Sequence, residues 1–252
     1  MIYDFQKASF LKRISAFLLD FVLIAIIATF FAWIVSLITN YSSILEEFSG
    51  HYARYESMYG ISLTDEAIFK TYTEEQLNTY KEAITAMNAD EDVLRCWGLV
   101  SNLPVVMVSV GFLFATLIVE FIFPIIFKNG QTIGKKIFKI GVINENGVIC
   151  SNFQLFARAI LGKCTIEYMI PGIIIVMMGL GTMGFIGPLI LLAIIGTNIA
   201  LVMVNPTKPF IHDLVAKSAV CDLSTQKIFK SNEEMIAYKE QIDRERAERS
   251  VY

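Results

Sequence analysis

The chain has 252 residues, of which 55% are hydrophobic and 18% are charged, and its formal net charge at pH 7 is −3. This composition is too apolar for an ordinary soluble domain of the same length, and it offers no strongly basic surface for nucleic acid. We therefore expect an integral membrane protein that binds no nucleic acid and needs no cofactor.

The first long apolar stretch covers residues 14–38 and contains one charged side chain, that of Asp20. A membrane-spanning helix needs about 20 apolar residues, whereas the apolar core of a signal peptide has about 7–15. We therefore expect residues 1–39 to form the N-terminus and a retained first transmembrane helix.

A polar segment, residues 40–104, separates the first apolar stretch from the second. Ser43 with Glu46 and Thr73 with Gln76 have the spacing of capping boxes, and apolar residues follow each pair at helical intervals. The pattern predicts two or three short helices. We expect them to form a self-packed lid, with contact to a partner protein through the tyrosines as the alternative.

The second transmembrane helix is expected over residues 105–127, where Glu120 is the only charged residue. Next, in residues 128–163, comes the motif GQTIGKK, which has glycines followed by lysines. A phosphate-binding loop needs four residues between its glycines and a hydroxyl residue after its lysine. Three residues separate Gly130 from Gly134, so nucleotide binding is excluded.

The rest of residues 128–163 predicts a β-hairpin and an amphipathic helix. An Asn–Gly turn within residues 144–147 lies between apolar runs, and Ser151 with Gln154 has the spacing of a capping box. Such a helix on a basic inner surface would lie against lipid headgroups. The residues expected to contact anionic headgroups are Lys135, Lys136 and Arg158.

Residues 164–204 contain the third apolar stretch, in which residues 168–204 carry no charge. As one helix, residues 168–204 would be about 55 Å long, while the hydrocarbon core of a bilayer is about 30 Å thick. Glycines and Pro188 near its middle favour two helices, over residues 167–182 and 185–204. One spanning helix with a re-entrant or surface segment is the alternative.

The 21 lysine and arginine residues are unevenly distributed. Residues 40–104 have four of them and 11 of the 24 acidic residues, whereas residues 1–13, 128–163 and 205–252 have three, six and eight. Because positive charge marks the cytoplasmic side, we expect both termini and residues 128–163 inside, with residues 205–252 as a cytoplasmic segment and charged tail. The chain thus reads as an all-α integral membrane protein with four transmembrane helices, a helical extracytoplasmic insert and a small cytoplasmic β-hairpin.

Three polar side chains fall at a similar depth in the expected helices. Asp20, Glu120 and Asn198 each lie about 9–10 Å inside the cytoplasmic face. Polar residues on spanning helices usually face the bundle interior, so we expect one shared, inward-opening site for an ion or a proton. A structural network that fixes the helix register is the alternative, and the pattern leaves the identity of any bound metal open.

Arg13 is an unsuitable partner for Asp20, although seven residues place both on nearly the same helix face. The rise between them is about 10.5 Å, and helical side chains lean toward the N-terminus, so Arg13 points away. Asp213, just after the last helix, lies at a level that Arg13 can reach. We therefore expect Arg13 and Asp213 to form a structural or gating ion pair.

Three motifs resemble those of the RDD family of bacterial membrane proteins. They are Arg13 with Asp20, GQTIGKKIFKIGV after the second helix, and HDLVAKSAV after the last. The arginine and two aspartates for which that family is named would be Arg13, Asp20 and Asp213. Glu120, ahead of the glycine-rich segment, resembles a frequent feature of the family.

The resemblance covers residues 5–39, 105–163 and about 190–222. Two features depart from the family pattern: the long segment 40–104, and Lys217, which replaces a small residue usual after the His–Asp motif. The resemblance implies transport as the general function, and sodium/proton exchange has been proposed for some members.

Two functional hypotheses follow. The first is a transporter or exchanger of small cations or protons in a bacterial plasma membrane, using the intramembrane carboxylates. The second is a non-transport scaffold or accessory subunit that docks a partner protein. We expect no enzyme activity, because no serine or cysteine nucleophile is placed near His51 or His212. We expect a homo-oligomer, since four helices enclose little volume.

Overall fold

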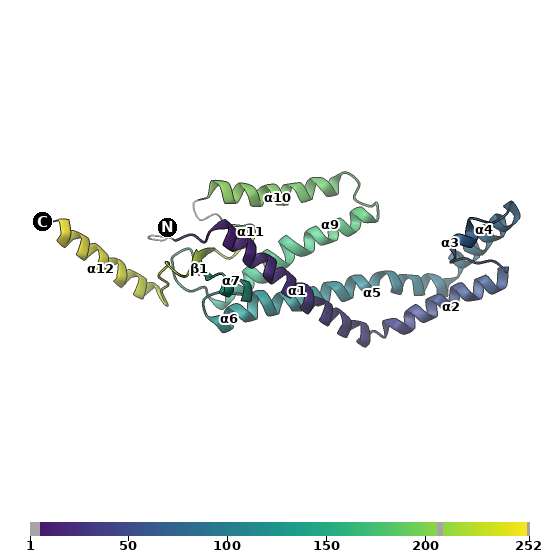
Figure 1. Cartoon of the computed structure of the whole chain (residues 1–252), viewed down its shortest axis with the longest axis horizontal. Helices are drawn as coiled ribbons and strands as arrows, with labels where there is room; N and C mark the ends of the chain where they lie inside the picture. Colours follow the sequence, from purple (N-terminus) through teal and green to yellow (C-terminus); the bar gives the residue numbers. More distant parts are fainter. Residues whose placement is uncertain (1–5, 206–208, 251–252) are drawn as a thin grey trace. The chain divides into compact units, whose positions relative to one another are not determined.

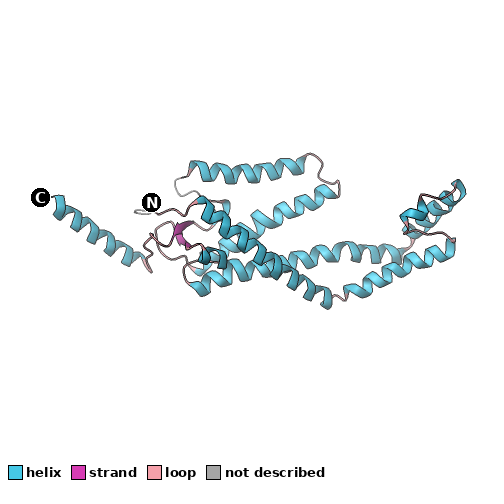
Figure 2. Ribbon diagram, viewed as in Figure 1, coloured by secondary structure: helices cyan, strands magenta, loops and turns pink. Residues whose placement is uncertain are grey.

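The computed structural model describes residues 6–205 and 209–250, and most of these residues are helical (Figures 1 and 2). The helices are α1 (Phe10–Ile38), α2 (Tyr41–Tyr59), α3 (Glu66–Phe69), α4 (Glu74–Ala89), α5 (Glu91–Thr116), η1 (Leu117–Ile122), α6 (Phe123–Phe127), α7 (Ile133–Ile137), α8 (Asn152–Phe156), η2 (Ala157–Met169), α9 (Ile170–Gly179), α10 (Ile186–Val204), α11 (Ile211–Val215) and α12 (Asn232–Ser250). The segments η1 and η2 are π-helices. The strands are β1 (Ile140–Asn144) and β2 (Ser218–Asp222).

Among the described residues, four helical runs are long and apolar enough to cross a membrane. They are Phe10–Ile38, Glu91–Phe127, Asn152–Gly179 and Ile186–Val204. Together with a two-stranded antiparallel sheet, they confirm the predicted fold class. The last two runs are separate helices, as predicted, and Gly181 and Gly184 in the turn between them have φ angles of 72° and 48° that glycine adopts without strain.

The chain divides into two compact units, residues 28–112 and residues 1–27 with residues 113–252. The first unit contains α2, α3 and α4 with the adjoining parts of α1 and α5. Its buried core consists of Tyr55, Met87 and Val93, surrounded by partly buried aromatic and aliphatic side chains. The insert therefore is helical and has its own core, which is what a self-packed lid requires.

Two of the three capping boxes predicted from the sequence are present in the structure. The capping boxes predicted at the starts of α4 and α8 are both present. The one predicted at Ser43 is not, because α2 already begins at Tyr41, directly after Asn40 in the left-handed conformation. The second candidate span also begins earlier than the residue 105 expected from apolar content, since the helix continues back to Glu91.

The small sheet lies in the second unit and is not formed by one hairpin. The predicted turn is present, since the Gly147 N–H donates to the Asn144 carbonyl at 2.9 Å. After that turn, however, the chain forms only an isolated β-bridge with β1, between Ile143 and Ile149, and not a second strand. β1 instead pairs in antiparallel register with β2, so that Val142 lies opposite Val220. The strand pair thus brings the chain after the last candidate span beside the segment that follows the second.

The helix expected on the inner surface is the first part of the third candidate span. Its polar side is not at the surface as expected, because Arg158 is buried, and so is Lys163. The π-helical winding of η2 explains this, because its hydrogen bonds link residues five apart rather than four. Arg158 and Lys163, five residues apart, consequently lie on one face.

Candidate functional site

Six charged side chains of the second unit are almost fully buried. They are Asp20, Glu120, Lys135, Arg158, Lys163 and Asp213, with Arg13 close behind at 9% side-chain exposure. A buried charge is costly unless it is paired and hydrogen-bonded, so the partners of each group define the site. We call these seven residues the charge network.

Asp20 of α1 binds the start of α7. Its carboxylate accepts hydrogen bonds from the Thr132 hydroxyl and from the Gly134 backbone N–H, the latter at 2.8 Å. Gly134 is required at this contact, because a Cβ there would lie 2.4 Å from the Ala16 carbonyl oxygen. Both of these donors to Asp20 are neutral groups, so they solvate its charge without cancelling it.

Glu120 of η1 lies between two ammonium groups. It accepts a hydrogen bond from Lys163 of η2 and another from Lys135 of α7, whose Nζ lies 3.2 Å from Oε2. Lys135 also interacts electrostatically with Asp20. Two lysines therefore balance two carboxylates, and Lys135 is the positive group that Glu120 and Asp20 share.

Burial lowers the pKa of Lys135 from its ordinary value to about 8, although the adjacent carboxylates oppose this change. The positive side chains of Lys163 and Arg158 act in the same direction as burial. The Lys135 ammonium can therefore lose its proton near physiological pH.

Asp213 of α11 forms the second centre of the network. Arg158 donates to its Oδ1 from Nε at 3.1 Å and from Nη2 at 2.9 Å, and Arg13 donates to its Oδ2 at 3.1 Å. The predicted pair of Arg13 and Asp213 is thus present, and its role as a gate stays a prediction. Burial alone would raise the pKa of Asp213, but the neighbouring His212 and the guanidinium groups of Arg158 and Arg13 outweigh it and hold that pKa well below its usual range.

His212 and Asn198 complete the surroundings of Asp213. His212 approaches Glu167 of η2, with Nδ1 2.7 Å from Oε1, and burial lowers the pKa of this imidazole. Asn198 of α10 accepts a hydrogen bond from the Ile211 N–H at 3.1 Å, and its amide donates to the Ile194 carbonyl. Its hydrogen bonds therefore fasten α10 to α11, rather than reaching the carboxylates with which it was expected to share a site.

The expectation of lipid headgroup contact is wrong for two of its three residues. Lys135 is 6% exposed and Arg158 is 3% exposed, and both are engaged by buried carboxylates. Lys136 is exposed, and its ammonium lies 4.0 Å from the centre of the Phe127 ring. Headgroup contact stays a prediction for Lys136 alone.

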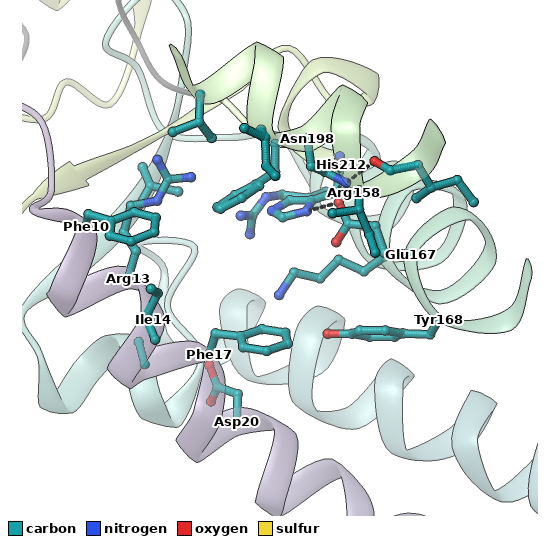
Figure 3. Close-up of a pocket in the computed structure, with 18 of the residues that line it drawn as sticks. Phe10, Arg13, Ile14, Phe17, Asp20, Arg158, Glu167, Tyr168, Asn198 and His212 are labelled. Atoms are coloured by element: carbon teal, nitrogen blue, oxygen red, sulfur yellow. Dashed lines mark hydrogen bonds and ion pairs between the residues drawn. The ribbon is translucent and has the colours of Figure 1, made fainter. Parts of the chain in front are cut away.

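A cavity of about 800 Å³ lies beside the charge network (Figure 3). Figure 3 shows Arg13, Phe17 and Asp20 on α1, facing the side chains of Glu167, Tyr168 and His212 across this space. Side chains of α9 and α10 make most of its other walls, and all of these except Asn198 are apolar. The cavity is therefore apolar along most of its wall and charged at one end.

The sequence did not indicate several of these participants. Lys163 and Glu167 had a weak signal, as the last charges before the uncharged stretch 168–204. Thr132 and Gly134 had none, because their part depends on the close approach of α1, which no local pattern shows.

Residues 96–217 match the model of the RDD family. No curated protein and no solved structure matches the chain. The matched range includes Glu120 and Asp213 with their lysine and Arg158 partners. Arg13 and Asp20 precede the matched range, but both form hydrogen bonds with residues inside it.

Proposed function

Because residues 96–217 match the model of the RDD family, we propose that the protein exchanges a small cation for a proton at Asp20 and Glu120, with Lys135 as the group that releases the proton. The observation that carries this proposal is the position of Lys135, whose ammonium is the positive charge shared by two buried carboxylates.

Loss of the Lys135 proton leaves the site one positive charge short. Glu120 then keeps the hydrogen bond from Lys163, and Asp20 keeps those from its two neutral donors. An uncompensated buried carboxylate is strongly unfavourable, so a monovalent cation entering as the proton leaves restores the balance. One proton is exchanged for one cation, and the net charge of the site does not change.

The donor atoms suit a hard cation. The Asp20 and Glu120 carboxylates and the Thr132 hydroxyl supply oxygen ligands, which alkali and alkaline-earth ions prefer over nitrogen and sulfur. The neutral amine of Lys135 would remain beside the ion and take up a proton when the ion leaves.

The groups that face Lys135 come from three elements: Asp20 from α1, Glu120 from η1, and Lys163 with Arg158 from η2. Two of these groups are negative and two are positive, so their effects on the pKa of Lys135 oppose one another, and burial is the largest single cause of its lowered pKa. This supports a proton that is exchangeable near neutral pH, which a cation–proton exchanger needs.

The test is cation-driven proton movement in liposomes that contain the purified full-length protein and a pH-sensitive dye. We expect imposed Na⁺ or K⁺ gradients to move protons with the wild type. In Lys135→Arg the exchange should be lost, because arginine keeps the ion pair with Glu120 but does not release its proton at these pH values. Lys136→Arg, one residue away and exposed, is the matched control and should retain exchange.

Asp20→Asn and Glu120→Gln are expected to abolish exchange, with elution volume and helical circular dichroism reporting whether they fold. Wild-type liposomes that move no protons under any cation gradient would contradict the proposal. Such silent liposomes, together with robust co-purification of a second protein, would favour the scaffold function.

The cavity favours a second candidate ligand, an anionic lipid, whose acyl chain would follow the apolar wall while its headgroup meets Arg13 at the charged end. Filling the cavity with Ile195→Trp should lower retention of phosphatidylglycerol in native mass spectrometry. Ile190→Trp, on the same helix but not lining the cavity, is the control. Equal retention of phosphatidylglycerol and phosphatidylcholine by the wild type would rule this candidate out.

A further inference from the structure

Three side chains that commonly bind metals gather in the unit of residues 28–112, which contains no residue of the charge network. Glu47 and His51 are four residues apart on α2, so they lie on one helix face, and Cys96 comes from α5. One donor atom of each residue, a carboxylate oxygen, a ring nitrogen and the sulfur, lies within 4.8 Å of the other two.

The ring of His51 carries the second observation. Its Nε2 atom is buried and has no hydrogen-bond partner among the described residues. Buried polar atoms are nearly always hydrogen-bonded, so an unpaired nitrogen on a ring that lies beside a thiol and a carboxylate points to a missing ligand. In the neutral ring that carries its proton on Nδ1, Nε2 offers a free lone pair.

The surrounding contacts hold the two helices together at this point. Arg95 Nη2 donates to Glu47 Oε1 at 3.1 Å, and the Cys96 thiol donates to the Ile44 carbonyl at 3.5 Å. The Phe48 ring lies 5.5 Å from that of Trp97. Cys96 is 1% exposed, so its sulfur is directed into the helix interface rather than into solvent.

We propose that Glu47, His51 and Cys96 bind a zinc-class divalent ion, with a fourth coordination position open to water. A thiolate, an imidazole and a carboxylate together form a donor set that zinc accepts, whereas magnesium and calcium require oxygen ligands. The ligands come from two helices that are distant in sequence and from three residue types, which is why no cysteine spacing motif reveals the site.

Metal binding requires only local changes. Bond lengths of about 2.0–2.3 Å place tetrahedral ligands roughly 3.5 Å apart, so donor atoms that lie within 4.8 Å of one another must approach by at most about 1.3 Å. The Cys96 thiol releases its proton, and its hydrogen bond to Ile44 is exchanged for the metal–sulfur bond. Glu47 keeps one oxygen on Arg95, which then orients the carboxylate as an outer partner of the site.

The test uses the full-length protein, purified in detergent with a tag that contains no histidine and stripped of metal with a chelator. We expect one Co²⁺ per chain, a sulfur-to-cobalt charge-transfer band in the near ultraviolet, and loss of that band when Zn²⁺ is added. The X-ray absorption spectrum of the zinc form should show one sulfur neighbour at about 2.3 Å. This last measurement needs no variant, and a spectrum without sulfur would overturn the proposal.

Variants assign the ligands. Cys96→Ser should remove the charge-transfer band, and His51→Gln should weaken zinc binding at least tenfold. The chain supplies matched controls in Cys164→Ser and His212→Gln, another buried cysteine and the second histidine, and both should keep the band. A band that survives Cys96→Ser, or that is lost in Cys164→Ser instead, would place the metal elsewhere and sink the assignment.

Discussion

Arg158 donates to a single oxygen of Asp213 from two of its nitrogens, at 3.1 and 2.9 Å, and both side chains are almost fully buried. Arg13 binds the other carboxylate oxygen. The first candidate span, the third candidate span and the segment after the last are therefore joined through one carboxylate. Removing it leaves two guanidinium groups without their counterion.

The first prediction concerns that carboxylate. Asp213→Asn should destabilise the protein by about 3–5 kcal/mol, the usual cost of breaking a buried ion pair by removing one partner. Asp222→Asn, which breaks a more exposed pair with Lys12, should cost about 1 kcal/mol or less. Thermal unfolding in detergent compares the two, and equal losses would show that burial does not set the strength of the Asp213 pairs.

The second prediction concerns pH. Because the pKa of Lys135 is lowered to about 8, the residue is protonated at lower pH, and a cation must displace that proton. Apparent cation affinity should therefore rise about tenfold per pH unit below pH 8 and level off above it. Cation titrations between pH 6 and 9 check this, and Lys135→Arg should give weak binding that does not change over the same range.

The third prediction concerns close packing. A Cβ on Gly134 would lie 2.4 Å from the Ala16 carbonyl oxygen and 3.0 Å from the Asp20 carboxyl carbon. Gly134→Ala should thus push α1 away from α7 and cost about 1–3 kcal/mol. Gly196→Ala in α10 has open space around its Cβ and should be neutral or stabilising. A Gly134→Ala protein as stable as the wild type would mean that α1 and α7 do not approach so closely.

The fourth prediction concerns Lys217, at a position where a small residue was expected. Its φ angle is 49°, in the left-handed region that glycine adopts without strain. Lys217→Gly should therefore stabilise the protein by about 1 kcal/mol. Lys230→Gly, at a described residue with no positive φ, should be slightly destabilising. Chemical denaturation of both variants measures the difference in sign.

The parts that the sequence predicts well are those set by composition or by length along a helix. The four spans follow from apolar stretches of sufficient length, and the approach of Arg13 to Asp213 follows from comparing their levels. The prediction fails where tertiary contacts decide. The partner of β1 lies far along the chain, and the helical period assumed for residues 151–163 differs from the π-helical winding that turns Arg158 and Lys163 inward.

Asn198 shows a different limit. Its depth was estimated well enough to place it on the wall of the same cavity as Asp20. The depth of a residue does not determine where its side chain points, however, and the Asn198 side chain accepts a hydrogen bond from the Ile211 N–H. Likewise, Lys135 and Arg158 were predicted to lie at the surface. No local pattern in the sequence shows that each of them forms an ion pair with a buried carboxylate.

The distance in sequence between Asp20 and its donors has a consequence for biosynthesis. Asp20 leaves the ribosome 112 residues before Thr132 and 114 residues before Gly134. The first helix therefore enters the membrane before the groups that donate to Asp20 have been synthesised. A charged residue at this depth costs about 2.5–3.5 kcal/mol, which the apolar residues of the helix must offset. Nascent chains that end before α7 should leave that helix poorly anchored and open to quality-control proteases.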